Sequence, residues 1–247
     1  MNSTNPIASA TEGFLVSFTA DRLNVHVYEN PTQLGIAAAN AVAAQIRYLI
    51  TERNRAIGIF SGVASQIELL NQLVKTVGIE WTRVIGFQAA ENLGADESSP
   101  QSQRKILLDH LVRKVPVAEF HGIRGEAANP DAVSANYAAL LQSRPPDFAV
   151  LEIGGGGELA AIDSLNCDFN DSSDVKMTGS AIALTVGALM ACQSLFVIAS
   201  GEAKRLAIQA AIEGAISDSC PASILRTHPH AHLFIDRTIA AKLSRFI

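Results

Sequence analysis

Apolar and polar positions follow two different periods along this chain. Short runs that are mostly apolar, or that alternate apolar and polar residues, predict strands at residues 22–29, 55–62, 82–89, 147–153, 193–200 and 230–236. Longer segments in which apolar residues recur every three to four positions predict helices at residues 31–54, 64–78, 98–115, 131–143 and 201–214. A proline near the start of the first helix and a glycine at the end of the second agree with these limits.

The alternation of strands and helices predicts a fold of the α/β class. Helices of about ten to fifteen residues between strands are typical of βαβ units, so we expect a three-layer αβα sandwich with a mostly parallel, doubly wound sheet. We expect residues 23–247 to form a single domain and residues 1–22 to be an N-terminal extension before the first strand. In such sheets, ligands bind beyond the carboxyl ends of the strands. This rule nominates the loops at residues 61–65, 88–99, 154–159 and 200–204.

Composition narrows the partners and the compartment. A net charge of -5 argues against a nucleic-acid surface. No run of about 18 apolar residues predicts a membrane span, and the N-terminus lacks the pattern of a signal peptide. The three cysteines, Cys167, Cys192 and Cys220, have no short spacing, which indicates reduced thiols in a cytoplasmic protein.

The most unusual stretch is the run of glycines at residues 154–157. It follows a predicted buried strand, where a glycine lets backbone come close to a ligand or adopt a positive φ. The run does not fit the dinucleotide fingerprint, because Leu159 stands where the third glycine belongs, so we expect no nicotinamide cofactor. Two interpretations stay open, a close approach to a ligand and a site from which larger residues have been lost.

Other polar residues have weaker signals. Ser61, Gly62 and Ser65 lie between a strand and a helix, where backbone N–H groups suit a phosphate, although an ordinary turn capped by Ser65 explains them equally well. Lys204 begins a helix and is either a solvated lysine or the cation for such a ligand. The histidines at positions 228, 230 and 232 could share a metal. No acidic or cysteine partner lies nearby in the sequence, so we expect a strand and no metal.

Three further stretches carry a resemblance to a known family. Residues 99–107 (SPQSQRKIL), 201–205 (GEAKR) and 220–229 (CPASILRTHP) resemble segments of the glucosamine-6-phosphate deaminases and the related 6-phosphogluconolactonases. The resemblance runs from about residue 23 to the C-terminus, and the last stretch favours the deaminase branch. It implies a doubly wound α/β fold, a role in carbohydrate metabolism and a sugar phosphate as the small-molecule partner. It leaves a homo-oligomer open.

The resemblance also implies that catalytic residues are replaced. The family's catalytic loop reads Gly-Ile-Gly-x-Asp-Gly-His, followed by an acid five residues after the histidine. In this chain Gly156 stands in the place of the aspartate, Glu158 in that of the histidine, and Asp163 at the downstream acid. In the loop after the third strand, Ala90 replaces the aspartate that moves a proton between C1 and C2 of the sugar, and Glu91 follows it.

The phosphate site is altered as well. Val63 and Ala64 replace hydroxyl residues, and Ser180 and Ala181 stand where the family has an arginine, which leaves Lys204 as the charged ligand. The residues expected to bind the substrate are Ser61, Gly62, Ser65, Gly154, Gly155, Gly156 and Lys204.

Two functions therefore remain. The first is a sugar-phosphate isomerase, deaminase or lactone hydrolase with a rebuilt acid–base set of Glu158, Glu91 and Asp163, joined by Glu152. The second is a binding or regulatory protein that keeps the fold without the chemistry. The ordinary deaminase reaction is not expected, because neither alanine nor glycine can transfer a proton.

Overall fold

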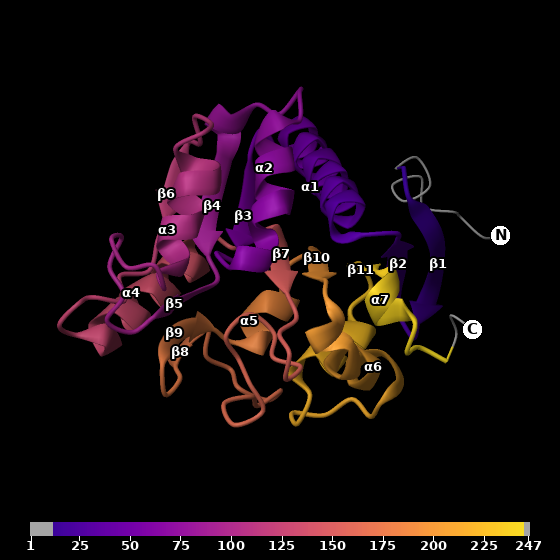
Figure 1. The fold of residues 1–247 in the computed structure, drawn as a ribbon. Coiled ribbons are helices and arrows are strands. Elements are labelled where there is room, and N and C mark those ends of the chain that lie inside the picture. Colours follow the sequence, from indigo (N-terminus) through magenta and orange to yellow (C-terminus); the bar gives the residue numbers. More distant parts are fainter. Residues whose placement is uncertain (1–11, 245–247) are drawn as a thin grey trace.

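A computed structural model describes residues 12–244 of the chain. A sheet of eight strands runs through the molecule, and Figure 1 shows how the helices surround it. Its strand order is β1-β2-β11-β10-β7-β3-β4-β6. The strands are β1 (Phe14–Ala20), β2 (Leu23–Tyr28), β3 (Ala56–Phe60), β4 (Val84–Gln88), β6 (Glu119–His121), β7 (Phe148–Glu152), β10 (Ser194–Ala199) and β11 (Ala231–Asp236). All neighbours pair in parallel except β1 and β2. A small antiparallel sheet joins β5 (Ala90–Asn92), β9 (Ala181–Leu184) and β8 (Val175–Met177).

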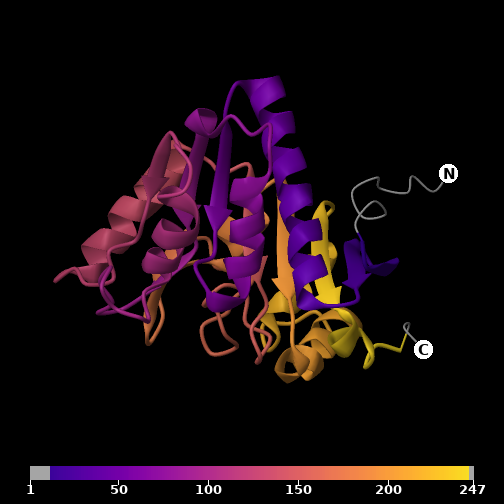
Figure 2. The same ribbon diagram turned by 45° about the horizontal axis from the view of Figure 1, so that its top comes forward.

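Helices cover both faces of the large sheet (Figures 1 and 2). One apolar cluster joins it to α1 (Pro31–Arg53), α2 (Ile67–Lys75) and α3 (Gln103–Leu107). A second cluster joins the opposite face to α4 (Pro130–Ser143), α5 (Val186–Met190), α6 (Arg205–Glu213) and α7 (Arg237–Ala240). The predicted three-layer α/β architecture is confirmed.

The long helix α1 illustrates how local sequence builds these layers. Asn30 caps it by accepting a hydrogen bond from the N–H of Gln33, and Pro31 occupies the first turn, where its missing N–H does no harm. By length and composition alone α1 could cross a membrane, but 61% of its apolar window is buried inside the fold. Its alanines let it pack closely on the sheet, as a core helix does.

Two predictions about chain segments are corrected. Residues 14–20, assigned to a loose extension, form the edge strand β1, which pairs with β2 through a tight turn at Asp21. Asp21 has a φ of 50°, a conformation that aspartate tolerates, so the turn lacks the glycine that would have revealed it. The helix predicted at residues 98–115 begins only at Gln103, with Ser102 as its cap. Residues 1–11 of the predicted extension lie outside the described part of the chain.

The order of the strands locates the site. From β3 the chain proceeds outward through β4 to β6, then returns to β7 beside β3 and continues the other way to β10 and β11. The topological switch point therefore lies between β3 and β7, where α/β sheets bind their ligands. The loops that leave these two strands are residues 61–65 and 153–159.

A pair of buried imidazoles lies between β2 and β11. His26 Nε2 is 3.1 Å from His232 Nδ1, and the two rings stack with their centroids 5.4 Å apart. Burial is the main cause that lowers the pKa of His26 to about 3 and that of His232 to about 4. Both imidazoles are therefore neutral at pH 7.

This pair predicts a loss of stability in acid. Both imidazoles have a pKa near 6.5 in the unfolded chain, so below that pH the unfolded state binds more protons. The pair's contribution is complete above pH 6.5 and is lost as the pH falls toward 3. At pH 5 each imidazole is expected to lower the free energy of unfolding by about 2 kcal/mol. His26→Phe should reduce the difference in urea stability between pH 7 and pH 5, whereas His110→Gln, at a partly exposed histidine, should leave it unchanged. An undiminished difference in His26→Phe would contradict the assignment.

Candidate functional site

A cavity of about 150 Å³ opens at the switch point. It is lined by Ser61, Val63, Gln103, Glu152, Gly154, Glu158, Ala160 and Ala161. These residues come from the end of β7, from the loops after β3 and β7 and from the start of α3, as the rule on strand ends predicts. The volume lies below the ~300 Å³ at which pockets for drug-sized ligands begin, so it suits a small ligand.

Ser61 presents a hydroxyl that the protein leaves unpaired. Its backbone N–H donates to Val150 O at 3.0 Å, which extends the pairing of β3 with β7 by one residue. Ser61 is only 2% exposed, and its Oγ has no hydrogen-bond partner among the described residues. A buried polar atom without a partner is costly, so this hydroxyl calls for a ligand or water in the cavity.

Gly62 is needed for the approach of α3 to this loop. A Cβ at Gly62 would lie 1.9 Å from the carbonyl oxygen of Gln103, a contact with backbone that no side-chain movement relieves. Gly62 was expected to help bind a phosphate, and its lack of a side chain has a further reason in the packing of α3 against this loop. The same contact brings Gln103 to the cavity, a position that nothing in the sequence indicates.

Glu152 lies between the cavity and two donors. Lys204 Nζ donates to Glu152 Oε2 at 2.8 Å, and Ser65 Oγ donates to the same oxygen. The side chains of Lys204 and Glu152 are 17% and 18% exposed, so this ion pair is largely screened from solvent. Glu152 lines the cavity, whereas Ser65 and Lys204 contact Glu152 and are not among the lining residues.

Lys204 is positioned from the end of β11. Asp236 is buried and caps α7, and its second oxygen accepts from the N–H of Gly201 at 2.8 Å. Gly201 has a φ of 91°, which favours glycine. This turn leads directly into the 3₁₀ turn that carries Lys204 toward Glu152.

The glycine run forms a compact turn. Gly154 N donates to Glu158 O at 3.0 Å, Gly157 N donates to Gly154 O at 3.2 Å, and Ile153 bridges to Leu159. Gly157 has a φ of 86°, and a Cβ on Gly154 would lie 1.8 Å from Glu158 Oε1. Two of the glycines therefore have structural reasons within the loop itself, while Gly155 and Gly156 are exposed.

Glu158 folds back over this turn. Its Oε2 accepts from the N–H of Gly156 at 2.8 Å, and its side chain lines the cavity together with Glu152. Ala160, which also lines the cavity, has a φ of 50°, an uncommon conformation for a residue with a Cβ. Such strain is found most often where a loop is shaped for a ligand.

Glu91 is in a different environment from Glu158. It is fully buried, and its two oxygens accept from the N–H groups of Asn92, Gln103 and Arg104, from Ser102 Oγ and from Gln88 Nε2, at 2.7–3.2 Å. The carboxylate thereby ties β5 to the start of α3. Its neighbour Ala90 is also fully buried, and neither residue lines the cavity.

Asp163 lies on the surface. Its Oδ1 accepts from the N–H groups of Leu165 and Asn166 and from Asn166 Nδ2, so it shapes a turn of its own loop. It is not among the residues that line the cavity. The structure therefore brings together Ser61, Glu158 and Glu152, and it separates Glu91 and Asp163 from them.

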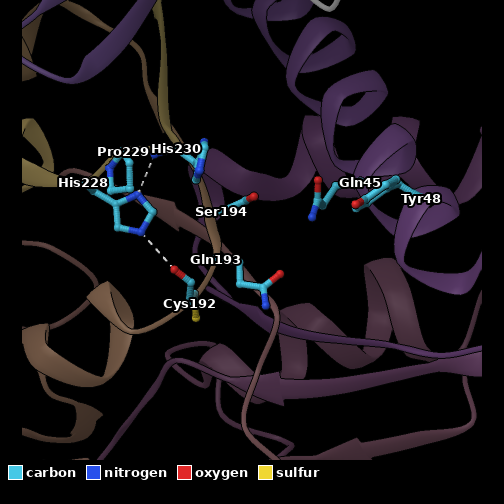
Figure 3. A pocket seen from close by; sticks show the side chains of 8 residues that line it. All are labelled: Gln45, Tyr48, Cys192, Gln193, Ser194, His228, Pro229 and His230. Carbon is cyan, nitrogen blue, oxygen red and sulfur yellow. Dashed lines mark hydrogen bonds between the residues drawn. The ribbon is translucent and has the colours of Figure 1, made fainter. Parts of the chain in front are cut away.

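A second hollow, of about 420 Å³, lies at the opposite end of β10 and β11 (Figure 3). Gln45 and Tyr48 of α1 line one side, and residues 192–194 and 228–230 line the other. Both nitrogens of His228 are occupied, since Nε2 bonds to Cys192 O at 2.9 Å and Nδ1 accepts from His230 N (Figure 3). Residues 12–244 contain no group of three or more His, Cys, Asp or Glu residues that could hold a metal.

The contacts of Glu91 predict a structural role. In Glu91→Gln, an amide NH₂ would face N–H donors, which leaves buried groups unpaired and should lower the free energy of unfolding by about 3 kcal/mol. Urea unfolding measures this change. Glu158→Gln, which removes the same charge from a partly exposed position, serves as the control and should change stability by less than about 1 kcal/mol. Equal stabilities of the two variants would contradict the role assigned to Glu91.

The glycine turn predicts a second contrast. Gly157→Ala forces a side chain into a positive φ and against Cys220 Sγ, which a Cβ would meet at 3.1 Å. The free energy of unfolding of this variant should fall by about 1–2 kcal/mol. Gly155→Ala has no positive φ to maintain and meets only Ala203 O at 3.9 Å, so it should stay within about 0.5 kcal/mol of the parent. Thermal unfolding compares the pair, and a Gly155→Ala variant as unstable as Gly157→Ala would refute this account of the turn.

Comparison with known proteins assigns the chain to a family. The family model described as glucosamine-6-phosphate isomerases/6-phosphogluconolactonase matches residues 29–234. The chain is 25% identical over 240 residues to a glucosamine-6-phosphate deaminase of Lactobacillus delbrueckii subsp. bulgaricus, covering 90% of this chain and 100% of that one. It is 28% identical over 231 residues to a glucosamine-6-phosphate deaminase of Cellvibrio japonicus, covering 81% and 84%.

Solved structures agree on the fold. A monomeric glucosamine-6-phosphate deaminase superposes with a TM-score of 0.77 at 20% identity, covering 88% of this chain and 98% of that one. A 6-phosphogluconolactonase from Shewanella baltica superposes with a TM-score of 0.75 at 18% identity, covering 86% and 96%. The expected resemblance is confirmed, and the chain belongs to the family of glucosamine-6-phosphate isomerases and 6-phosphogluconolactonases.

Proposed function

We propose that this chain binds a sugar or sugar phosphate in the cavity at the switch point and does not carry out the deaminase reaction. Family membership supports the ligand class. The unpaired Ser61 hydroxyl and the carboxylates of Glu152 and Glu158 supply the polar groups that a hydroxyl-rich ligand needs.

The loop after β4 carries this proposal. In the family that the chain resembles, an aspartate of this loop moves a proton between two sugar carbons, and Ala90 stands in its place. Ala90 packs against Ile162, Ala183 and Val186 in a small apolar cluster. The carboxylate of its neighbour Glu91 accepts five hydrogen bonds from groups of the protein itself. Among the described residues, this loop therefore brings no proton-transfer group to the cavity, although such a group supplies about 10²- to 10⁴-fold in rate.

A second function has one observation in its favour. Glu152 and Glu158 line the same cavity, and two carboxylates in unlike surroundings can serve as acid and base. Glu152 is held by a lysine and a serine, whereas Glu158 accepts from a backbone N–H. A rebuilt enzyme that acts on a sugar phosphate would therefore use Glu158 with Glu152, and it would use neither Glu91 nor Asp163.

One experiment distinguishes these functions. Proton NMR follows glucosamine 6-phosphate and glucosamine, each incubated with a high concentration of the purified protein over hours. The proposal predicts broadened sugar resonances for at least one of the two and no fructose 6-phosphate. Ser61→Ala should weaken the broadening, because it removes the unpaired hydroxyl.

Product formation would overturn the proposal if Glu158→Gln abolished it, and the rebuilt enzyme would then replace it. Product that persists in Glu158→Gln would indicate a contaminating deaminase. Unchanged spectra with both sugars would contradict the proposed ligand class.

A further inference from the structure

The two donors that could hold an anion at this site are already occupied. Lys204 Nζ and Ser65 Oγ converge on one oxygen of Glu152, and no other partner of the Lys204 ammonium is found among the described residues. An ammonium and a hydroxyl that converge on a single point are the groups with which a protein holds a phosphate oxygen. Here that point is taken by a carboxylate of the chain itself.

We propose that the Glu152 carboxylate fills the anion subsite of the cavity, so that the site takes an unphosphorylated sugar and rejects the phosphorylated one. This inference rests on the proposed function and selects between the two ligands that it allows. Glu152 is the specificity-determining residue, because it lines the cavity and occupies both Ser65 and Lys204, which do not line it.

Charge at the cavity supports the exclusion. Lys204 pairs with Glu152, while Glu158 lines the same cavity with no cationic partner in residues 12–244, so two carboxylates and one ammonium give the cavity and its neighbouring groups a net negative charge. The neighbouring Arg205 is directed to Glu202 and adds no cation to the cavity lining. A phosphate monoester would have to displace Glu152 from Lys204 and remain beside two carboxylates, which is unfavourable in a site largely screened from water.

The remaining polar groups suit hydroxyls. Ser61 offers an unpaired hydroxyl that can donate or accept, and Glu158 offers acceptor oxygens. Gly154 and Ala160 also line the cavity, and their small size leaves space for a ligand. Sugar hydroxyls pair with all of these groups and carry no charge that must be neutralised, and an amino group on the sugar would be favoured by the two carboxylates.

The test measures the dissociation constant of inorganic phosphate by calorimetry for the parent and for Glu152→Gln. Glutamine keeps the size of the side chain and removes its charge, so Lys204 becomes available to an anion. Affinity for phosphate should rise tenfold or more, equivalent to about 1.4 kcal/mol. Glu202→Gln is the matched control, because it removes the same charge from an exposed residue two positions before Lys204, and it should change affinity less than twofold.

A second variant keeps the test decisive. Adding Lys204→Met to Glu152→Gln should abolish the gain, since the ammonium is the cation that the anion would use. Melting temperatures establish that each variant is folded. An equal phosphate affinity in the parent and in folded Glu152→Gln would overturn the inference, as would a gain that survives the loss of Lys204.

The sugars separate this inference from the function on which it rests. The parent should bind glucosamine at least tenfold more tightly than glucosamine 6-phosphate, and Glu152→Gln should narrow or reverse that ratio. Tighter binding of the phosphorylated sugar by the parent would overturn the inference and leave the proposed function intact. Binding of neither sugar, together with a phosphate gain in Glu152→Gln, would contradict the proposed function while the assignment of Glu152 to the anion subsite stands.

Discussion

The parallel pairing of β3 with β7 is the contact on which the site depends. The chain leaves β3 in one direction and returns to β7 before continuing in the other, so the loops that follow these strands meet at one edge of the sheet. Ser61 N donates to Val150 O and prolongs the pairing just as the two backbones begin to diverge. The cavity lies at these strand ends, where Ser61 directly follows β3 and Glu152 is the last residue of β7.

Charge compensation at this point organises the neighbouring loops. A partly buried carboxylate such as Glu152 is stable only if donors neutralise it. Those donors come from two directions, Ser65 from the turn before α2 and Lys204 from the turn before α6. Lys204 depends in turn on Gly201, which Asp236 holds from the end of β11. One carboxylate thus links the ends of β3, β7, β10 and β11, and its removal would affect all of these loops.

Much of the fold could be predicted because burial imposes a local pattern. Core strands such as β7 and β10 are apolar except for Glu152 at the end of β7 and Ser194 at the start of β10, and α1 carries its own caps, so each was recognisable without the rest of the chain. The strands β5, β8 and β9 are only three or four residues long, too short to show a period. The edge strand β1 was not predicted, because its turn uses Asp21, and the positive φ of an aspartate cannot be recognised from the sequence.

Residues of the candidate site could be predicted only where polar residues or glycines lie in the loop directly after a strand. Ser61, Glu158 and the glycines were found by their position after β3 and β7. Gln103 was missed because it reaches the cavity through a contact between α3 and Gly62, which are far apart in the sequence. Glu91 illustrates the opposite difficulty. A carboxylate beside a nominated loop has the sequence signal of a catalytic acid, and only the fold shows that its oxygens are taken up by the start of α3.

The glycine run at residues 154–157 shapes the loop that follows β7. A run of this kind can indicate a site emptied of its side chains, but the turn that bridges Ile153 to Leu159 needs the positive φ of Gly157, and Gly154 leaves room for the Glu158 side chain. The turn sends the chain back on itself, so that Glu158 returns to the cavity that Glu152 already lines. The effect is to place two carboxylates at the end of one strand, where the family pattern that the chain resembles has a glycine and a histidine. The end of β7 and the loop after it thus present two carboxylates to the cavity, and the missing side chain of Gly154 leaves the room that the Glu158 carboxylate occupies.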